Sequence, residues 1–298
     1  ILVGIIYTLL SVGAFTMVYP LSLMLAGSLK SDADAWSIKP YPEFWFKDTV
    51  LFRKYVEAKY NVVTTNAQYS WERPIISWRT LERPEDIVQQ NLIDDFRQWR
   101  SSIPVEKRII GSMNAASGKV VFAKNLRSYK RYMSEKFSGD IRAYNVAANQ
   151  LFISWTSVTP PVEMIGRNLN PNIPPDFLEE LNKWKETISP DDAYADSARG
   201  HYVFGYLYGI YSRAIDNYNK AHGSNYSSYM DIDLPRRVPS TNSLEREDWI
   251  KFVRNEMKLS YVRLDDSLQE SFRKFIADNY QTIEAFNKSR STNFLNFA

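Results

Sequence analysis

The sequence predicts a mainly α-helical protein in which one N-terminal transmembrane helix is followed by a helical-repeat domain of four copies, the last truncated. Three observations predict this fold. A long apolar segment opens the chain, an aromatic pattern with helical spacing recurs four times, and a second helical pattern follows each of the first three copies. We expect the transmembrane helix at residues 1–29, a linker at 30–50 and the repeat domain at 51–298.

The N-terminal segment is predicted to span a membrane. No charged residue occurs before Lys30, and about 20 apolar residues suffice to cross a hydrocarbon layer of roughly 30 Å. Pro20 is compatible with a membrane helix, in which Pro is tolerated. A cleavable signal peptide, the competing interpretation, would show a basic start and a shorter apolar core, and this segment shows neither.

The linker contains two prolines, Pro40 and Pro42, among several aromatic residues. Trp and Tyr are enriched where membrane helices meet the lipid headgroups, so the segment is interpreted as an aromatic collar at the membrane surface. A Pro-rich connector packed on the following domain is the alternative, and the sequence does not choose between them.

The repeat is defined by a ladder of apolar residues whose first three positions lie three and five residues apart, which is close to one face of a helix. The ladders are Phe52, Tyr55, Tyr60 and Val63; Tyr129, Tyr132, Phe137 and Ile141; Val203, Tyr206, Tyr211 and Ile215; and Phe272, Phe275, Tyr280 and Ile283. An Asn follows each ladder, at Asn66, Asn145, Asn219 and Asn287. The copies are expected near 52–104, 126–190, 200–258 and 268–298.

A second helix is predicted after each of the first three ladders, following an irregular arm and a turn. Its apolar residues are Ile87, Leu92, Phe96 and Trp99 in copy one; Phe177, Leu181, Trp184 and Ile188 in copy two; and Trp249, Phe252, Val253 and Met257 in copy three. We expect the copies to stack side by side, so that neighbours bury each other's apolar faces. Because copy four ends within its arm, the chain is expected to be truncated.

Two sets of repeated residues are candidates for a site. The arm aromatics Trp78, Trp155, Tyr229 and Phe297 are candidate ligand-binding residues that would stack on sugars, although aromatics at repeat positions also fill seams between units. The repeated residues Asn66, Asn145, Asn219 and Asn287 define the repeat and are assigned a structural role, because an Asn side chain readily bonds nearby backbone.

Composition restricts the chemistry. The 298 residues carry 37 basic and 34 acidic side chains, a formal net charge of +3 that argues against a dedicated nucleic-acid binder. With no cysteine and only two histidines, His201 and His222, thiolate zinc sites, cysteine nucleophiles and Ser-His-Asp relays are absent or poorly supplied. We therefore expect no catalytic residue, no metal ion, no cofactor and no enzymatic activity.

The segment Ser28-Leu29-Lys30-Ser31-Asp32, with Pro20 and Met24 before it, resembles the end of the first membrane helix in maltose-type carbohydrate ABC transporter permeases. The resemblance covers about 30 of the 298 residues. It implies a bacterial inner membrane, with residues after about 30 extracytoplasmic (periplasmic). The implied partners are a second permease subunit, ATPase subunits and a solute-binding protein. Members of that family continue with further membrane helices and an ATPase-docking loop, and nothing after Lys30 matches these.

The repeat is similar to a segment in the catalytic barrel of bacterial β-galactosidases, over about 25 residues per copy. The similar stretches are Tyr280–Lys288 and Ile215–Pro235. The similarity brings neither the barrel strands nor the paired carboxylates of a glycosidase, so it indicates a carbohydrate context and not catalysis.

The function predicted from these features is the N-terminal fragment of a carbohydrate ABC transporter permease subunit, with an extracytoplasmic insertion that binds sugar or docks the solute-binding protein. Oligosaccharide and membrane lipid are further expected partners. One alternative is a membrane-anchored carbohydrate-binding or scaffold protein with a single helix. A degenerate glycosidase is the other.

Overall fold

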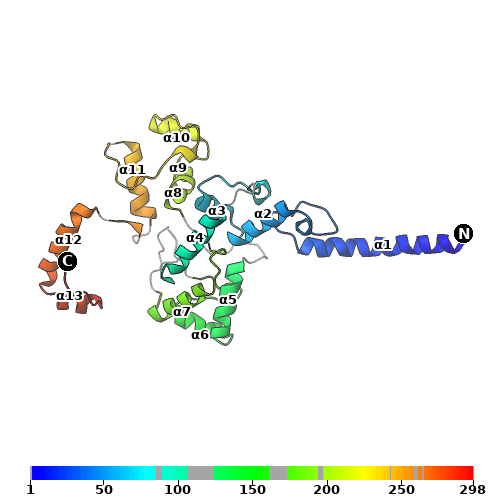
Figure 1. Cartoon of the computed structure of the whole chain (residues 1–298), viewed down its shortest axis with the longest axis horizontal. Coiled ribbons are helices and arrows are strands. Elements are labelled where there is room, and N and C mark those ends of the chain that lie inside the picture. The colour runs from blue at the N-terminus through cyan, green and yellow to red at the C-terminus, as the bar shows by residue number, and fades with distance from the viewer. Residues whose placement is uncertain are drawn as a thin grey trace.

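The computed structural model describes residues 2–84, 89–105, 124–160, 173–193, 197–241, 243–257, 261–263 and 265–297. Within these residues the chain is mainly helical and contains no β-strand. Figure 1 shows a long N-terminal helix at one end, a central group of helices, and α12 with α13 at the other end.

The N-terminal helix α1 covers Leu2–Ser28, 27 residues that include Pro20. Its apolar side chains are exposed on all sides, and Ala26 is its only buried residue. At 1.5 Å per residue it is about 40 Å long, which exceeds the thickness of a hydrocarbon layer. In the described part of the chain it is the one helix long and apolar enough to cross a membrane.

The predicted single ladder helix is wrong, because a helix break divides each ladder region into a longer element and a helix of eight residues. The pairs are α2 (Asp48–Lys59) with α3 (Thr64–Trp71), α5 (Lys124–Lys136) with α6 (Ile141–Ala148), the continuous α8–η4–α9 run (Ala198–His201, Tyr202–Leu207, Tyr208–Tyr211) with α10 (Ile215–His222), and α12 (Gln269–Tyr280) with α13 (Ile283–Arg290). A residue with positive φ lies in every break, for example Ser212 and Gln281. A left-handed residue cannot continue a right-handed helix, so the chain turns there.

The helices after the arms are α4 (Gln90–Ser102), α7 (Pro175–Glu186) and α11 (Leu244–Lys251), the last continuing as the π-helical η6 (Phe252–Glu256). Short 3-10 turns complete the set: η1 (Glu43–Trp45), η2 (Trp78–Thr80), η5 (Tyr229–Asp231) and η8 (Asp266–Leu268). We refer to residues 48–105 as unit one, 124–193 as unit two, 197–257 as unit three and 265–297 as unit four, each without its undescribed residues.

Units one, two and three each have their own apolar core, built around Trp78, Trp184 and Tyr202 respectively. Unit one contacts both unit two and unit three. Helix α5 of unit two packs on α2, whereas α3 packs against α8 and η4 of unit three. The approach of α3 to α8 is close: a Cβ added at Gly200 would lie 2.0 Å from the carbonyl oxygen of Tyr69.

The expected burial of the apolar face of α4 is also wrong. Phe96 and Trp99 are 52% and 59% exposed, whereas Leu181 and Trp184, at the same spacing in α7, are buried. In unit four the ladder residues Phe272 and Phe275 are likewise exposed. Ile87 lies outside the described residues.

Candidate functional site

Three of the repeated asparagines fasten the arm to the eight-residue helix that precedes it. In each, the side-chain Nδ2 donates to a backbone carbonyl seven residues further on, and Oδ1 accepts the N–H of that same residue, at 2.8–3.0 Å. The pairs are Asn145 with Phe152, Asn219 with Tyr226, and Asn287 with Phe294. Both ends of the amide are therefore engaged by the backbone of their own unit.

In unit one this position is occupied by Gln68, and Asn66 lies two residues before it. Gln68 is the fifth residue of α3, as Asn145 is of α6, and its Oε1 accepts the N–H of Ile75, seven residues on, at 3.3 Å. Asn66 instead donates to the carbonyl oxygen of Tyr60. Gln68 falls outside the repeated pattern predicted from the sequence, because that pattern is defined by Asn. The signal was the spacing to the arm, since Trp78 follows Gln68 by as many residues as Trp155 follows Asn145.

The four arm aromatics lie in four different units, and the structure does not bring them together into one site. Trp78 and Tyr229 are 1% and 3% exposed, so protein covers their ring faces. Trp155 donates from Nε1 to the carbonyl oxygen of Gly139, and the Tyr229 hydroxyl donates to that of Ser212, each at 2.8 Å. The Trp155 and Tyr229 side chains thus each bond the turn between the two helices of their own unit.

Phe297 lies against the ring of Phe286, with 6.1 Å between the ring centroids. Both residues belong to unit four, where Phe297 is partly buried. It occupies the position that Trp155 has in unit two, ten residues after the bonded Asn. Its contact is therefore also within its own unit.

A buried polar cluster joins α10 to α11 in unit three. The Tyr211 hydroxyl donates to Oδ2 of Asp248 at 2.7 Å, and His222 Nε2 lies 3.2 Å from the same oxygen. The Tyr218 ring stacks on the imidazole, with 4.0 Å between centroids. Burial lowers the pKa of His222, and the negative charge of Asp248 opposes that shift. The side chains of His222 and Asp248 are 6% and 3% exposed, which makes the cluster a cross-link inaccessible to substrate.

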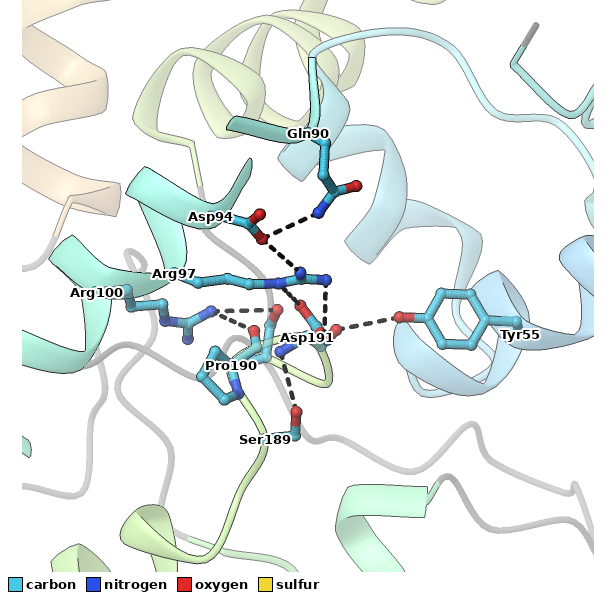
Figure 2. A network of polar contacts seen from close by, with 9 residues as sticks. Tyr55, Gln90, Asp94, Arg97, Arg100, Ser189, Pro190 and Asp191 are labelled. Carbon is cyan, nitrogen blue, oxygen red and sulfur yellow. Dashed lines mark hydrogen bonds and ion pairs between the residues drawn. The ribbon is translucent and has the colours of Figure 1, made fainter. Parts of the chain in front are cut away.

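Polar contacts hold α4 to unit two (Figure 2). The guanidinium of Arg97 donates to both carboxylate oxygens of Asp191 at 3.0 and 3.1 Å, and Arg100 donates to the carbonyl oxygen of Pro190 at 2.8 Å. The Tyr55 hydroxyl of α2 donates to the backbone oxygen of Asp191. Because the Arg97–Asp191 pair is half exposed, solvent screens it and it adds little to stability.

The joint between units one and three is centred on Glu72, the left-handed residue that ends α3. Arg199 donates to its carboxylate at 2.6 Å and also to the carbonyl oxygen of Ile232 at 3.0 Å. Ser197, the N-cap of α8, bonds the same carboxylate. Gln68 adds a buried hydrogen bond to the carbonyl oxygen of Phe204. The residues that end α3 therefore also orient unit three.

The end of α1 is fastened to α2. Lys54 Nζ donates to the carbonyl oxygen of Leu29 at 2.9 Å, to Ser31 Oγ at 3.0 Å and to Asp34 Oδ1 at 3.1 Å. The buried Glu57 carboxylate accepts the N–H of Asp32 and that of the next residue, at 3.1 and 3.3 Å. Burial raises the pKa of Glu57. These contacts fix how the first helical unit is mounted on the apolar helix.

The aromatic linker beside this joint is exposed. Trp36, Trp45 and Phe46 are 75%, 62% and 73% exposed. Arg79 places its guanidinium 4.9 Å from the Trp36 ring centroid. The connector packed on the next domain, one of the two interpretations of this segment, therefore does not describe these three side chains.

The described residues contain no group of three or more His, Asp or Glu side chains that could hold a metal ion. Comparison with known proteins adds no assignment: no protein family, no curated protein and no solved structure matches the chain.

Proposed function

We propose that the chain belongs to a carbohydrate ABC transporter permease subunit in a bacterial inner membrane. Its helical units stand on the extracytoplasmic side and dock a solute-binding protein. In this proposal the four units are copies of one repeat, related by the amide that bonds the arm seven residues on. The permease resemblance of the segment after α1 motivates the proposal.

The joint between α1 and α2 is the observation that carries it. Lys54 and Glu57 form five hydrogen bonds with the segment 29–34, which overlaps the residues that carry the permease resemblance. Hydrogen bonds that hold a membrane helix rigidly to an extracytoplasmic domain suit a receptor for a mobile protein, because the docking surface then keeps its height and orientation above the bilayer.

Docking of a protein is favoured over sugar binding by the arms for two reasons. The arm rings Trp78 and Tyr229 are covered by protein. The apolar face of α4, which includes Leu92, Phe96 and Trp99, is exposed, although Arg97 and Arg100 of the same helix bond unit two. Exposed apolar patches rimmed by polar residues are typical of protein–protein contacts.

The test is extraction of the native protein from its own membranes in a mild detergent, followed by identification of stoichiometric partners. We expect an ABC-type ATPase and a second permease subunit. The absence of any ATPase would contradict the transporter and leave the single-helix scaffold.

Sidedness is tested separately by single cysteines, which are clean reporters because the chain has none of its own. Leu151→Cys, at an almost fully exposed position, is expected to react with a membrane-impermeant maleimide from the extracytoplasmic side of intact spheroplasts. Labelling only after lysis would overturn the proposed orientation.

A further inference from the structure

A cavity of about 430 Å³ lies between units one and three, and the arms do not contribute to it. Tyr69 of α3 forms one wall. Gly205 and Tyr206 of η4, Gly209 of α9, and Phe252 with Glu256 of η6 form much of the remainder. The volume falls in the range of roughly 300–1,000 Å³ that is usual for small-molecule sites.

The cavity walls include two π-helical segments. η4 (Tyr202–Leu207) and η6 (Phe252–Glu256) are both π-helical, a rare conformation that is frequent at functional sites. They lie in different helices of unit three and meet where the Tyr206 and Phe252 rings pack, 5.6 Å apart between centroids. Gly200 lets the backbone of Tyr69 approach closely, which fixes the opposite wall.

The walls combine aromatic rings with two polar groups, the half-buried Tyr206 hydroxyl and the exposed Glu256 carboxylate. Within the described residues, neither group makes a hydrogen bond or an ion pair with the protein. Burial, with the negative charges of Asp248 and Glu256, raises the pKa of Tyr206 to about 12. The phenol therefore stays protonated at neutral pH and can donate, and the Glu256 side chain offers acceptor oxygens.

The character of the walls selects among ligand classes. The described lining includes His201 but no Lys or Arg, so it lacks the permanently charged cations that commonly bind phosphates. Gly205 and Gly209 contribute no side chains to the walls; the Tyr69 ring covers Gly205, whereas no atom lies within 4 Å of a Cβ built at Gly209. The open trough beside Gly209 leaves room for a ring, whereas a compact cation is bound best when aromatic faces enclose it.

We infer that this cavity binds a neutral sugar of one or two rings, with the C–H face of a pyranose against Tyr206 and its hydroxyls donating to Glu256. Aromatic faces carry negative potential and attract electropositive C–H groups, and a carboxylate is a strong acceptor for hydroxyl donors. The site goes beyond the proposed function and does not require it, since a scaffold without transport activity could carry the same cavity.

The experiment is isothermal titration of the full chain in a polyoxyethylene detergent, because maltoside detergents carry the chemistry under test. The probes are maltose, lactose, cellobiose and tetramethylammonium. Glu256→Gln is compared with Glu247→Gln, an exposed carboxylate on the preceding helix that pairs with Lys251. Gly209→Leu fills the trough at a helical position, where Leu is the better helix former.

We expect at least one disaccharide to bind, with a Kd of roughly 1 μM to 1 mM. Glu256→Gln should weaken it about tenfold, Glu247→Gln should leave it unchanged, and Gly209→Leu should abolish it with the melting temperature retained. Binding of none of the three sugars, binding of tetramethylammonium alone, or sugar binding that survives Gly209→Leu would overturn the inference. Sugar binding in a protein that extracts without an ATPase would uphold this site while refuting the transporter.

Discussion

Replacing Asn145 by Ala tests whether one amide holds the arm of unit two to its helix. The substitution removes two hydrogen bonds, of 2.9 and 3.0 Å, to the backbone of Phe152. A typical intramolecular hydrogen bond contributes about 0.5–1.5 kcal/mol net, so the arm should lose about 1–3 kcal/mol of local stability. Asn145→Asp keeps the acceptor and loses the donor, and about half of the loss is expected.

The assay is native-state hydrogen exchange by mass spectrometry on the full chain, read on the peptide that contains residues 149–157. A loss of 1–3 kcal/mol corresponds to exchange about 5- to 150-fold faster through local opening. Val146→Ala is the matched control, because Val146 is the next residue and is 83% exposed. Equal exchange in Asn145→Ala and Val146→Ala would refute the structural role of the amide.

Three further predictions concern other parts of the chain. Burial lowers the pKa of His222 in the folded chain below its unfolded value of about 6.5, so between these two pKa values the unfolded chain binds more protons than the folded chain. The free energy of unfolding should therefore fall as the pH drops below about 6.5 and level off below the folded pKa. Chemical denaturation across pH 5–8 measures this, and a slope that persists in His222→Asn would assign it elsewhere. Lys54→Met should leave the buried Asp34 carboxylate without its cation and lower stability by about 3 kcal/mol. The loss should be seen as faster trypsin cleavage between residues 30 and 47, and unchanged cleavage would show that Lys54 does not hold the end of α1 to α2. The substitution Trp45→Phe leaves Trp36 as the sole tryptophan of the linker, and in vesicles of brominated lipid the fluorescence of Trp36 should be quenched. If the further substitution Trp36→Phe does not change the quenching of the protein, a membrane collar is excluded.

Local periodicity predicted helices at the right places but with the wrong boundaries. The ladder spacing indicates one helical face, yet the chain breaks at residues such as Ser212 and Gln281, whose positive φ no composition rule marks. Unlike Gly, these residue types carry no strong preference for the left-handed region. Each ladder was therefore interpreted as one helix where the structure has a break.

The register of unit one shows a different limit. The Asn-based pattern selected Asn66, although Gln68 holds the arm. Gln has the same amide group as Asn on a side chain longer by one methylene. Unit one therefore keeps an amide hydrogen bond to the arm although the residue type differs. Spacing to Trp78 would have found it, because the hydrogen bond depends on the length of the arm.

The sequence by itself determined the apolar character and length of α1, the helical periodicity of the units and the spacing between amide and arm. These are local properties, set by composition and by the pitch of a helix. Tertiary structure alone decided that unit one lies between units two and three, that the cavity at Tyr69 and Tyr206 exists, and which apolar faces are covered. Trp99 in α4 and Trp184 in α7 occupy the same spacing, yet one is exposed and the other buried. Periodicity fixes which side of a helix is apolar, whereas burial depends on which distant segment packs against it.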